Sequence, residues 1–200
     1  MAEAKQPQVA PATPAAVFAV GGLCFGFFAL LTGLVDATAT PVIAGWAMVV
    51  GGTVLICGVL EMVRGEVLLG STCLILGGLI GMGSGLAFHI TMGSPPEFWG
   101  AEFAQTGYIW IAIALILLGL LPCFGKISSS LFLAIALLVA IAAILAAGLI
   151  DGVAMGEGIM YLDGVLLLIF GIYCIYASTA LITHMVFGSP KLPIGGPIFK

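Results

Sequence analysis

Residues 131–150 of the chain read LFLAIALLVAIAAILAAGLI, a run that contains no charged side chain and no side-chain hydroxyl or amide. A helix that crosses a bilayer needs about 20 consecutive apolar residues, so this run is long enough to span one. A strand of a transmembrane barrel is about half as long and alternates apolar with polar residues. Because Leu131–Ile150 does not alternate, it predicts a transmembrane α-helix.

Other apolar runs of similar length lie on both sides of this one. The whole chain is 62% hydrophobic and 7% charged, whereas soluble domains average about 45–50% and about 25%. This composition excludes soluble enzymes, nucleic-acid-binding proteins and disordered proteins. The sequence therefore predicts an all-α integral membrane protein with six transmembrane helices, at about Ala15–Leu34, Val42–Val63, Val67–Ile90, Gly107–Phe124, Leu131–Ile150 and Tyr161–Val186.

These runs divide the chain into three parts. Residues 1–14, rich in Ala, Pro and Gln, are expected to form a flexible N-terminal tail, residues 15–186 the six-helix transmembrane domain, and residues 187–200 a C-terminal tail. Residues 91–106 are expected to form a polar loop between the third and fourth helices. Other domains are not predicted.

The basic residues predict the orientation in the membrane. With six spans, all five basic residues fall on the same side of the membrane. Because Lys and Arg prefer cytoplasmic loops, this is expected to be the cytoplasmic side. We therefore expect a multi-pass protein of the plasma (inner) membrane with both termini in the cytoplasm. The residues concerned are Lys5, Arg64, Lys126, Lys191 and Lys200.

The sequence offers little for catalysis or metal binding. Its five cysteines all lie in apolar runs without a C-x-x-C pair, and its two histidines are far apart. Metal sites need ligands clustered at short spacings, and no catalytic triad or carboxylate pair is recognisable. We expect no enzymatic activity, no metal and no cofactor.

Ionisable residues are expected only near the ends of the spans. Glu61 lies three residues before Arg64, so the two share a helix face and are expected to pair. Asp151 and Asp163 are expected at the outer boundary, in contact with water. Thr13 and Pro14 suit the start of a helix, whose free N–H groups attract carboxylates.

Small and hydroxyl-bearing residues recur at helical spacings. Gly77, Gly81 and Gly85 in the third run form a stripe that allows two helix backbones to approach closely. This stripe indicates packing within the bundle, or else space for a narrow conduit or a seam between subunits. In the sixth run, Tyr176 and Thr179 share a face that could line a route for a small solute.

Several segments together resemble the acetate uptake transporter family, the succinate–acetate permeases. The segment from Gly171 to Gly195, with Tyr176, Phe187-Gly188 and Leu192-Pro193-Ile194-Gly195, is similar to the sixth helix and C-terminal motif of that family. Three shorter segments are similar to the end of its second helix, its fourth loop and the opening of its first helix. They are Gly58–Gly65, which includes Glu61 and Arg64, Phe124–Lys126, and Thr13–Ala16, which includes Pro14.

The resemblance implies a six-helix protomer, a ring-shaped homo-hexamer and a narrow pathway through each protomer for acetate-like carboxylates. Aligned with that family, Gly22 and Leu76 fall at its pore aromatics, and Phe18 and Phe25 are candidates for the aromatic constriction instead. Tyr176 and Glu61 match the family pattern. The transport pathway expected from these positions comprises Phe18, Gly22, Phe25, Leu76, Tyr176 and Thr179.

Three functional hypotheses follow. The first is a channel or permease for small monocarboxylates such as acetate, passive or coupled to protons as a symporter, with the lipid bilayer and copies of the chain as its partners. Since no carboxylate is expected at mid-membrane, the proton would travel on the solute or with water. The second is a channel for small neutral solutes such as urea or amides, and the third is a non-conducting membrane subunit.

Overall fold

The computed structural model describes residues 10–151 and 155–199. It contains six candidate membrane spans, which bears out the all-α fold with six transmembrane helices. The third span, Val67–Gly93, is one continuous helical segment that we call span three. The helices are α1 (Thr13–Leu31), α2 (Thr40–Val63), α3 (Val67–Ile75), α4 (Ser84–Gly93), α5 (Trp99–Ile127), α6 (Ser130–Ala146) and α7 (Gly158–Phe187), with the π-helical segment η2 (Leu76–Gly83) joining α3 to α4 and short 3-10 turns η1 (Ala37–Ala39), η3 (Pro96–Phe98) and η4 (Ala147–Asp151).

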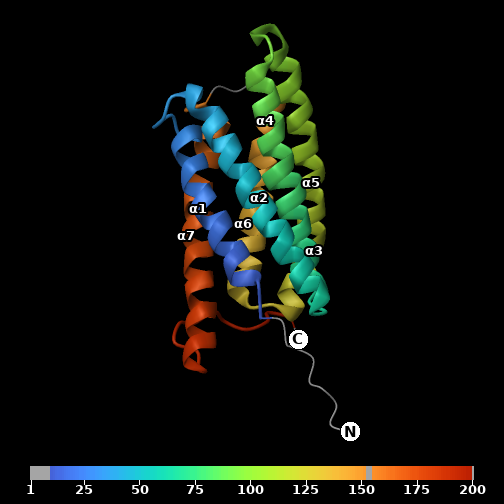
Figure 1. Cartoon of the computed structure of the whole chain (residues 1–200), viewed down its shortest axis with the longest axis vertical. Helices are drawn as coiled ribbons and strands as arrows, with labels where there is room; N and C mark the ends of the chain where they lie inside the picture. Colours follow the sequence, from blue (N-terminus) through green and yellow to red (C-terminus); the bar gives the residue numbers. More distant parts are fainter. Residues whose placement is uncertain (1–9, 152–154, 200) are drawn as a thin grey trace.

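The six spans run alternately up and down (Figure 1). Their contacts close them into a ring. Each span packs against the one before and the one after it in the chain, and α7 packs along α1 to close the ring. Because the number of spans is even, α1 begins and α7 ends at the same end of the bundle. We call this the terminal end, and the opposite end, where α7 begins, the far end.

The helix bounds differ from the sequence expectation at one loop. Residues 91–106 were expected to form a polar loop, yet α4 continues to Gly93 and α5 begins at Trp99. This expectation was wrong because Pro96 suits the first turn of the 3-10 segment η3, and Glu97 and Glu102 are acidic residues in first helical turns, where they are favourable. The first helix also starts at Thr13, inside the expected tail, and residues 1–9 lie outside the described residues.

Glycines bring α1 and α7 into direct backbone contact. A methyl group added at Gly21 would lie 3.1 Å from the Gly171 carbonyl oxygen, and one added at Gly171 would lie 3.0 Å from the Gly21 carbonyl oxygen. Further along, a methyl group added at Gly164 would lie 2.9 Å from the Thr32 side chain and 3.0 Å from the Leu31 side chain, at the end of α1. In lipid there is no hydrophobic driving force between helices, so the close packing that these small residues allow holds α1 and α7 together.

The glycine stripe of span three packs against α2 inside the bundle. A methyl group on Gly81 would lie 2.4 Å from the Gly51 Cα, and one on Gly77 would lie 2.7 Å from the Gly51 carbonyl oxygen. A methyl group on Gly85 would likewise lie 2.7 Å from the Ala44 carbonyl oxygen. Of the two interpretations of this stripe, the contacts favour packing within the bundle.

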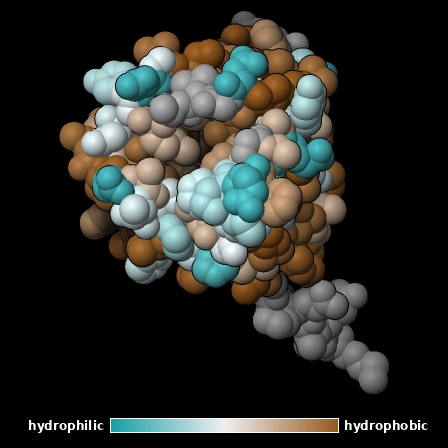
Figure 2. Space-filling view, turned by 90° about the horizontal axis from the view of Figure 1, so that it is seen from above, coloured by the Kyte–Doolittle hydropathy of each residue, from teal (hydrophilic) through white to brown (hydrophobic). Residues whose placement is uncertain are grey.

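The sides of the ring are apolar. Trp46, Val63 and Leu115 are more than half exposed on helices long enough to cross a membrane. Seen from the far end, pale and hydrophilic residues gather on the end face while hydrophobic residues surround it (Figure 2). This distribution is that of a protein surrounded by lipid, with its ends in water.

Candidate solute cavity

A cavity of about 100 Å³ lies inside the ring. Every span contributes to its wall, so it lies on the axis of the ring rather than between two neighbouring helices. An apolar cavity of about 150 Å³ is enough to bind benzene, so this space suits a smaller solute. One wall residue from each span is, in chain order, Leu23, Val54, Leu76, Trp110, Val139 and Phe170.

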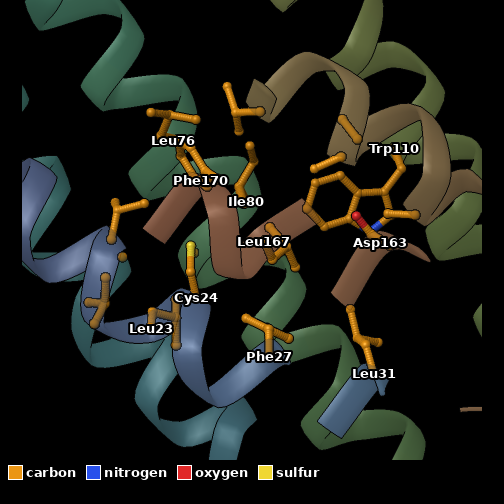
Figure 3. A pocket seen from close by; sticks show the side chains of 18 of the residues that line it. Leu23, Cys24, Phe27, Leu31, Leu76, Ile80, Trp110, Asp163, Leu167 and Phe170 are labelled. Atoms are coloured by element: carbon orange, nitrogen blue, oxygen red, sulfur yellow. The ribbon is translucent and has the colours of Figure 1, made fainter. Parts of the chain in front are cut away.

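Asp163 of α7 is the one charged residue among the described residues that line the cavity. Figure 3 shows it at one end of the cavity wall, where Trp110 and Leu31 also lie. The rest of the wall is formed mainly by aliphatic and aromatic side chains, including Phe27 and Phe170. As far as the described residues form it, the cavity therefore has an apolar body and a single carboxyl group.

The expectation that Asp163 contacts water at the outer boundary was wrong. The residue is 2% exposed, whereas Asp151 is exposed as expected. Asp163 lies in the second turn of α7, and the side chain faces the ring interior because Met160 and Leu167, three residues before and four after it, face the same cavity. The sequence signal was the position of this acid inside the apolar run 161–186, on the face shared with those residues.

The expected pathway residues do not come together in the structure. Leu76 lines the central cavity. Phe18 and Gly22 instead line a second hollow of about 470 Å³ on the outer side of the ring, between α1 and α2, where Trp46 and Ile43 also lie. We call this hollow the lateral groove.

The other expected pathway residues lie on the outer part of the bundle. Phe25 is 40% exposed and its ring lies beside Gly171 of α7. The Tyr176 hydroxyl donates a hydrogen bond of 2.9 Å to the Pro193 carbonyl oxygen, and the Thr179 hydroxyl donates to the Ile175 carbonyl of its own helix. None of the three lines the central cavity among the described residues.

Glu61 holds the start of α1 at the terminal end. Its Oε1 atom accepts hydrogen bonds from the Ala12 N–H at 2.7 Å, the Thr13 N–H at 2.6 Å and the Thr13 hydroxyl at 2.6 Å. Its Oε2 atom lies 3.6 Å from the Arg64 Nε, which confirms the expected ion pair. The start of the helix that opens with Thr13 and Pro14 was expected to attract a carboxylate, and Glu61 of α2 supplies it. The cap position is occupied by Ala12, not by Thr13.

The C-terminal segment covers the terminal end of α5 and α6. The Leu131 N–H donates to the Ile194 carbonyl, and the Ile198 N–H donates to the Gly125 carbonyl. The ring of Phe199 occupies the space beside Gly125. The segment that carries the motif with Pro193 is therefore a packed part of the bundle.

We expect Tyr176→Phe to loosen this segment. The substitution removes the hydrogen bond to Pro193, whose contribution is about 0.5–1.5 kcal/mol. Hydrogen exchange should accelerate at the Ser130 and Leu131 amides, which bond to the same segment. Tyr173→Phe, at an exposed position of the same helix, is the control and should leave both amides unchanged.

Six spans closed around the central cavity define the fold of this membrane protein. The structure of the bacterial acetate channel SatP matches this fold with a TM-score of 0.62, at 21% sequence identity, over 93% of this chain and 99% of that chain. SatP belongs to the acetate uptake transporter family, so the resemblance seen in the sequence is confirmed at the level of the fold. No family model matches the sequence, and no curated protein matches it.

Proposed function

We propose that this chain is a membrane channel or permease for small monocarboxylates such as acetate. The observation that carries the proposal is the cavity lined by all six spans, in a chain that shares its fold with an acetate channel. Its volume of about 100 Å³ suits a solute of this size and excludes large organic anions. Uptake is passive or linked to protons.

The apolar wall favours a solute that crosses without a full negative charge. An isolated carboxylate loses much of its hydration in such a space, at a cost of several kcal/mol or more. A carboxylic acid that carries its proton avoids most of this cost. Transport along a proton gradient follows from this preference, because each solute brings a proton with it.

We extend the proposal to the assembly and its orientation. The homo-hexamer rests on the family resemblance, and the apolar sides of the ring support placement in the plasma (inner) membrane. Arg64, Lys126 and Lys191 all lie at the terminal end, which supports cytoplasmic termini. Native mass spectrometry of the purified protein tests the number of subunits, and a monomer would contradict the hexamer.

Small neutral solutes such as urea and amides are the second candidate. The observation in their favour is the same wall, where a single carboxyl group faces an otherwise apolar space. Acetamide and acetate have nearly the same shape. A comparison of their uptake rates therefore distinguishes a protein that recognises the acid from one that admits any solute of this size. A protein that conducts neither solute fits the third hypothesis, a non-conducting membrane subunit.

The test is uptake of radiolabelled acetate into proteoliposomes with an acidic exterior. We expect saturable uptake above that of protein-free liposomes, and faster than the uptake of acetamide. A rate equal to that of protein-free liposomes would overturn the proposal.

A matched pair of variants tests the pathway. Leu76→Trp adds bulk to the cavity wall and is expected to reduce acetate uptake to the level of protein-free liposomes. Leu79→Trp, on the same segment but 44% exposed, should leave uptake unchanged. Uptake by Leu76→Trp equal to that of Leu79→Trp and of the unchanged protein would show that the solute does not pass through this cavity.

A further inference from the structure

Within the part of the chain that the structure describes, one oxygen of the buried Asp163 carboxyl group lacks a hydrogen-bond partner. Its Oδ1 atom is fully buried and has no hydrogen-bond partner among the described residues, and no lysine, arginine or histidine of that part of the chain forms an ion pair with it. Most buried side-chain polar atoms have at least one hydrogen-bond partner. An unpaired carboxyl group that faces a cavity therefore calls for a partner inside the cavity.

The cost of leaving this group alone is large. An ionised carboxylate without a donor or counter-charge is strongly unfavourable in an apolar space, and the neutral acid still loses a hydrogen bond. At a position of pure packing, a leucine would avoid that cost, as Leu167 does one turn further along the same wall. The acid at this position instead indicates recognition of a polar solute.

Few other titratable side chains lie near enough to share a proton with Asp163 or to balance its charge. Among the described residues that line the cavity, the one other titratable side chain is Cys24 of α1, while α2, span three and α6 present none. On α5 the wall residue is Trp110, and Glu102 lies two helical turns toward the far end. Near the start of α7, Glu157 is exposed to water.

We propose that Asp163 binds the solute in the cavity by pairing its carboxyl group with that of a small monocarboxylic acid through one shared proton. This inference rests on the proposed function for the class of solute. The shared proton lies between one carboxyl oxygen of Asp163 and one of the solute, and no covalent bond changes. The pair is the same whether the solute arrives as the acid or as the anion at a protonated Asp163.

Electrostatics limits the pair to one negative charge. Two carboxylates in contact cannot both be ionised, which is why paired carboxyl groups retain one proton between them. When both groups would be ionised in isolation, binding must take up a proton from solution. In that range the affinity for acetate falls about tenfold for each unit of rising pH.

The test is equilibrium binding of radiolabelled acetate to the purified full-length protein, from about pH 5 to about pH 9. Asp163→Leu, which removes both hydrogen bond and proton, should lower the affinity more than tenfold. Asp163→Asn keeps the size and can donate an N–H to the acetate anion, so it should bind acetate without the loss of affinity at high pH. Glu157→Gln, at the exposed acid near the start of α7, is the control and should match the unchanged protein.

A measurement on the unchanged protein avoids dependence on how the variants fold. Addition of carbon-13 acetate should produce an infrared band of a hydrogen-bonded carboxylic acid, in a pair that contains one proton. Equal affinity of Asp163→Leu and the unchanged protein overturns the inference, as does a pH dependence that survives in Asp163→Asn. Saturable binding of acetamide without binding of acetate also overturns it.

Uptake measured in parallel separates this inference from the proposed function. If the unchanged protein takes up acetate and Asp163→Leu binds acetate as well as it does, the proposed function stands and the role of Asp163 is overturned. Binding that depends on Asp163 without uptake supports the site and overturns the transport function. Absence of both binding and uptake overturns the two together.

Discussion

Gly81→Ala is expected to lower the thermal unfolding temperature of the purified protein by roughly 5–10 °C. The added methyl group would lie 2.4 Å from the Gly51 Cα and 3.0 Å from the Gly51 nitrogen, both of which are backbone atoms. Overpacking typically costs about 1–3 kcal/mol, and each kcal/mol lowers the unfolding temperature of a chain this long by about 2–4 °C. A clash with backbone falls at the upper end of that range, because relief requires the two helices to separate.

The same chain offers matched controls for this effect. A methyl group on Gly78, in the same segment, would meet only the Leu55 side chain at 3.6 Å, and one on Gly52 would meet nothing within 4 Å. Gly78→Ala and Gly52→Ala should therefore unfold at the temperature of the unchanged protein or slightly above it. Gly51→Ala should behave like Gly81→Ala, since its methyl group would lie 2.4 Å from the Met82 nitrogen.

A loss of stability common to all four variants would contradict this role of the helix contact, since only two of the added methyl groups meet backbone atoms of the facing helix. Helical glycine generally favours replacement by alanine, because glycine loses more conformational entropy on folding. Gly78→Ala and Gly52→Ala carry that general effect without the clash. The contact between α2 and span three is therefore measured by a difference in unfolding temperature. It is the difference between the variants with the clash, at Gly81 and Gly51, and those without it, at Gly78 and Gly52.

The spans could be predicted from the sequence because length and composition alone determine them. Leu131–Ile150 has no side chain that would interrupt a membrane helix, and the structure places α6 and η4 over the same stretch. The bounds of α5 could not be predicted in this way. Its first two turns contain Glu102 and Gln105, which look like a loop by polarity but form a helix at the far end of the ring.

The cavity could be predicted only in part, because which face of a helix points inward depends on its neighbours. Leu76 was expected on the pathway and lines the cavity, whereas Phe18 and Gly22 lie on the opposite side of α1, in the lateral groove. Apolar residues surround each helix, so periodicity does not distinguish the side that faces lipid from the side that faces the cavity. The position of Asp163 near the end of its apolar run predicts contact with water, yet the side chain is buried in the cavity wall.

Glu61→Ala is expected to destabilise the protein by about 3–5 kcal/mol, the usual cost of removing one partner from a buried charged group. The Glu61 side chain is 1% exposed and its Oε1 atom accepts three hydrogen bonds from Ala12 and Thr13. Its removal leaves those donors buried without an acceptor at the start of α1, where the helix dipole also favours a negative charge. Thermal unfolding of the purified protein measures the loss.

Two further variants separate the charge of Glu61 from its hydrogen bonds. Glu61→Gln keeps an acceptor oxygen for the same donors, so it should lose less stability than Glu61→Ala. Glu66→Gln, at an exposed acid five residues further on, should leave the unfolding temperature unchanged. Equal effects of Glu61→Ala and Glu66→Gln would contradict the role of Glu61 at the start of α1. Because α1 forms one wall of the cavity, a displaced α1 should also reduce acetate uptake, in proportion to the loss of stability across the series.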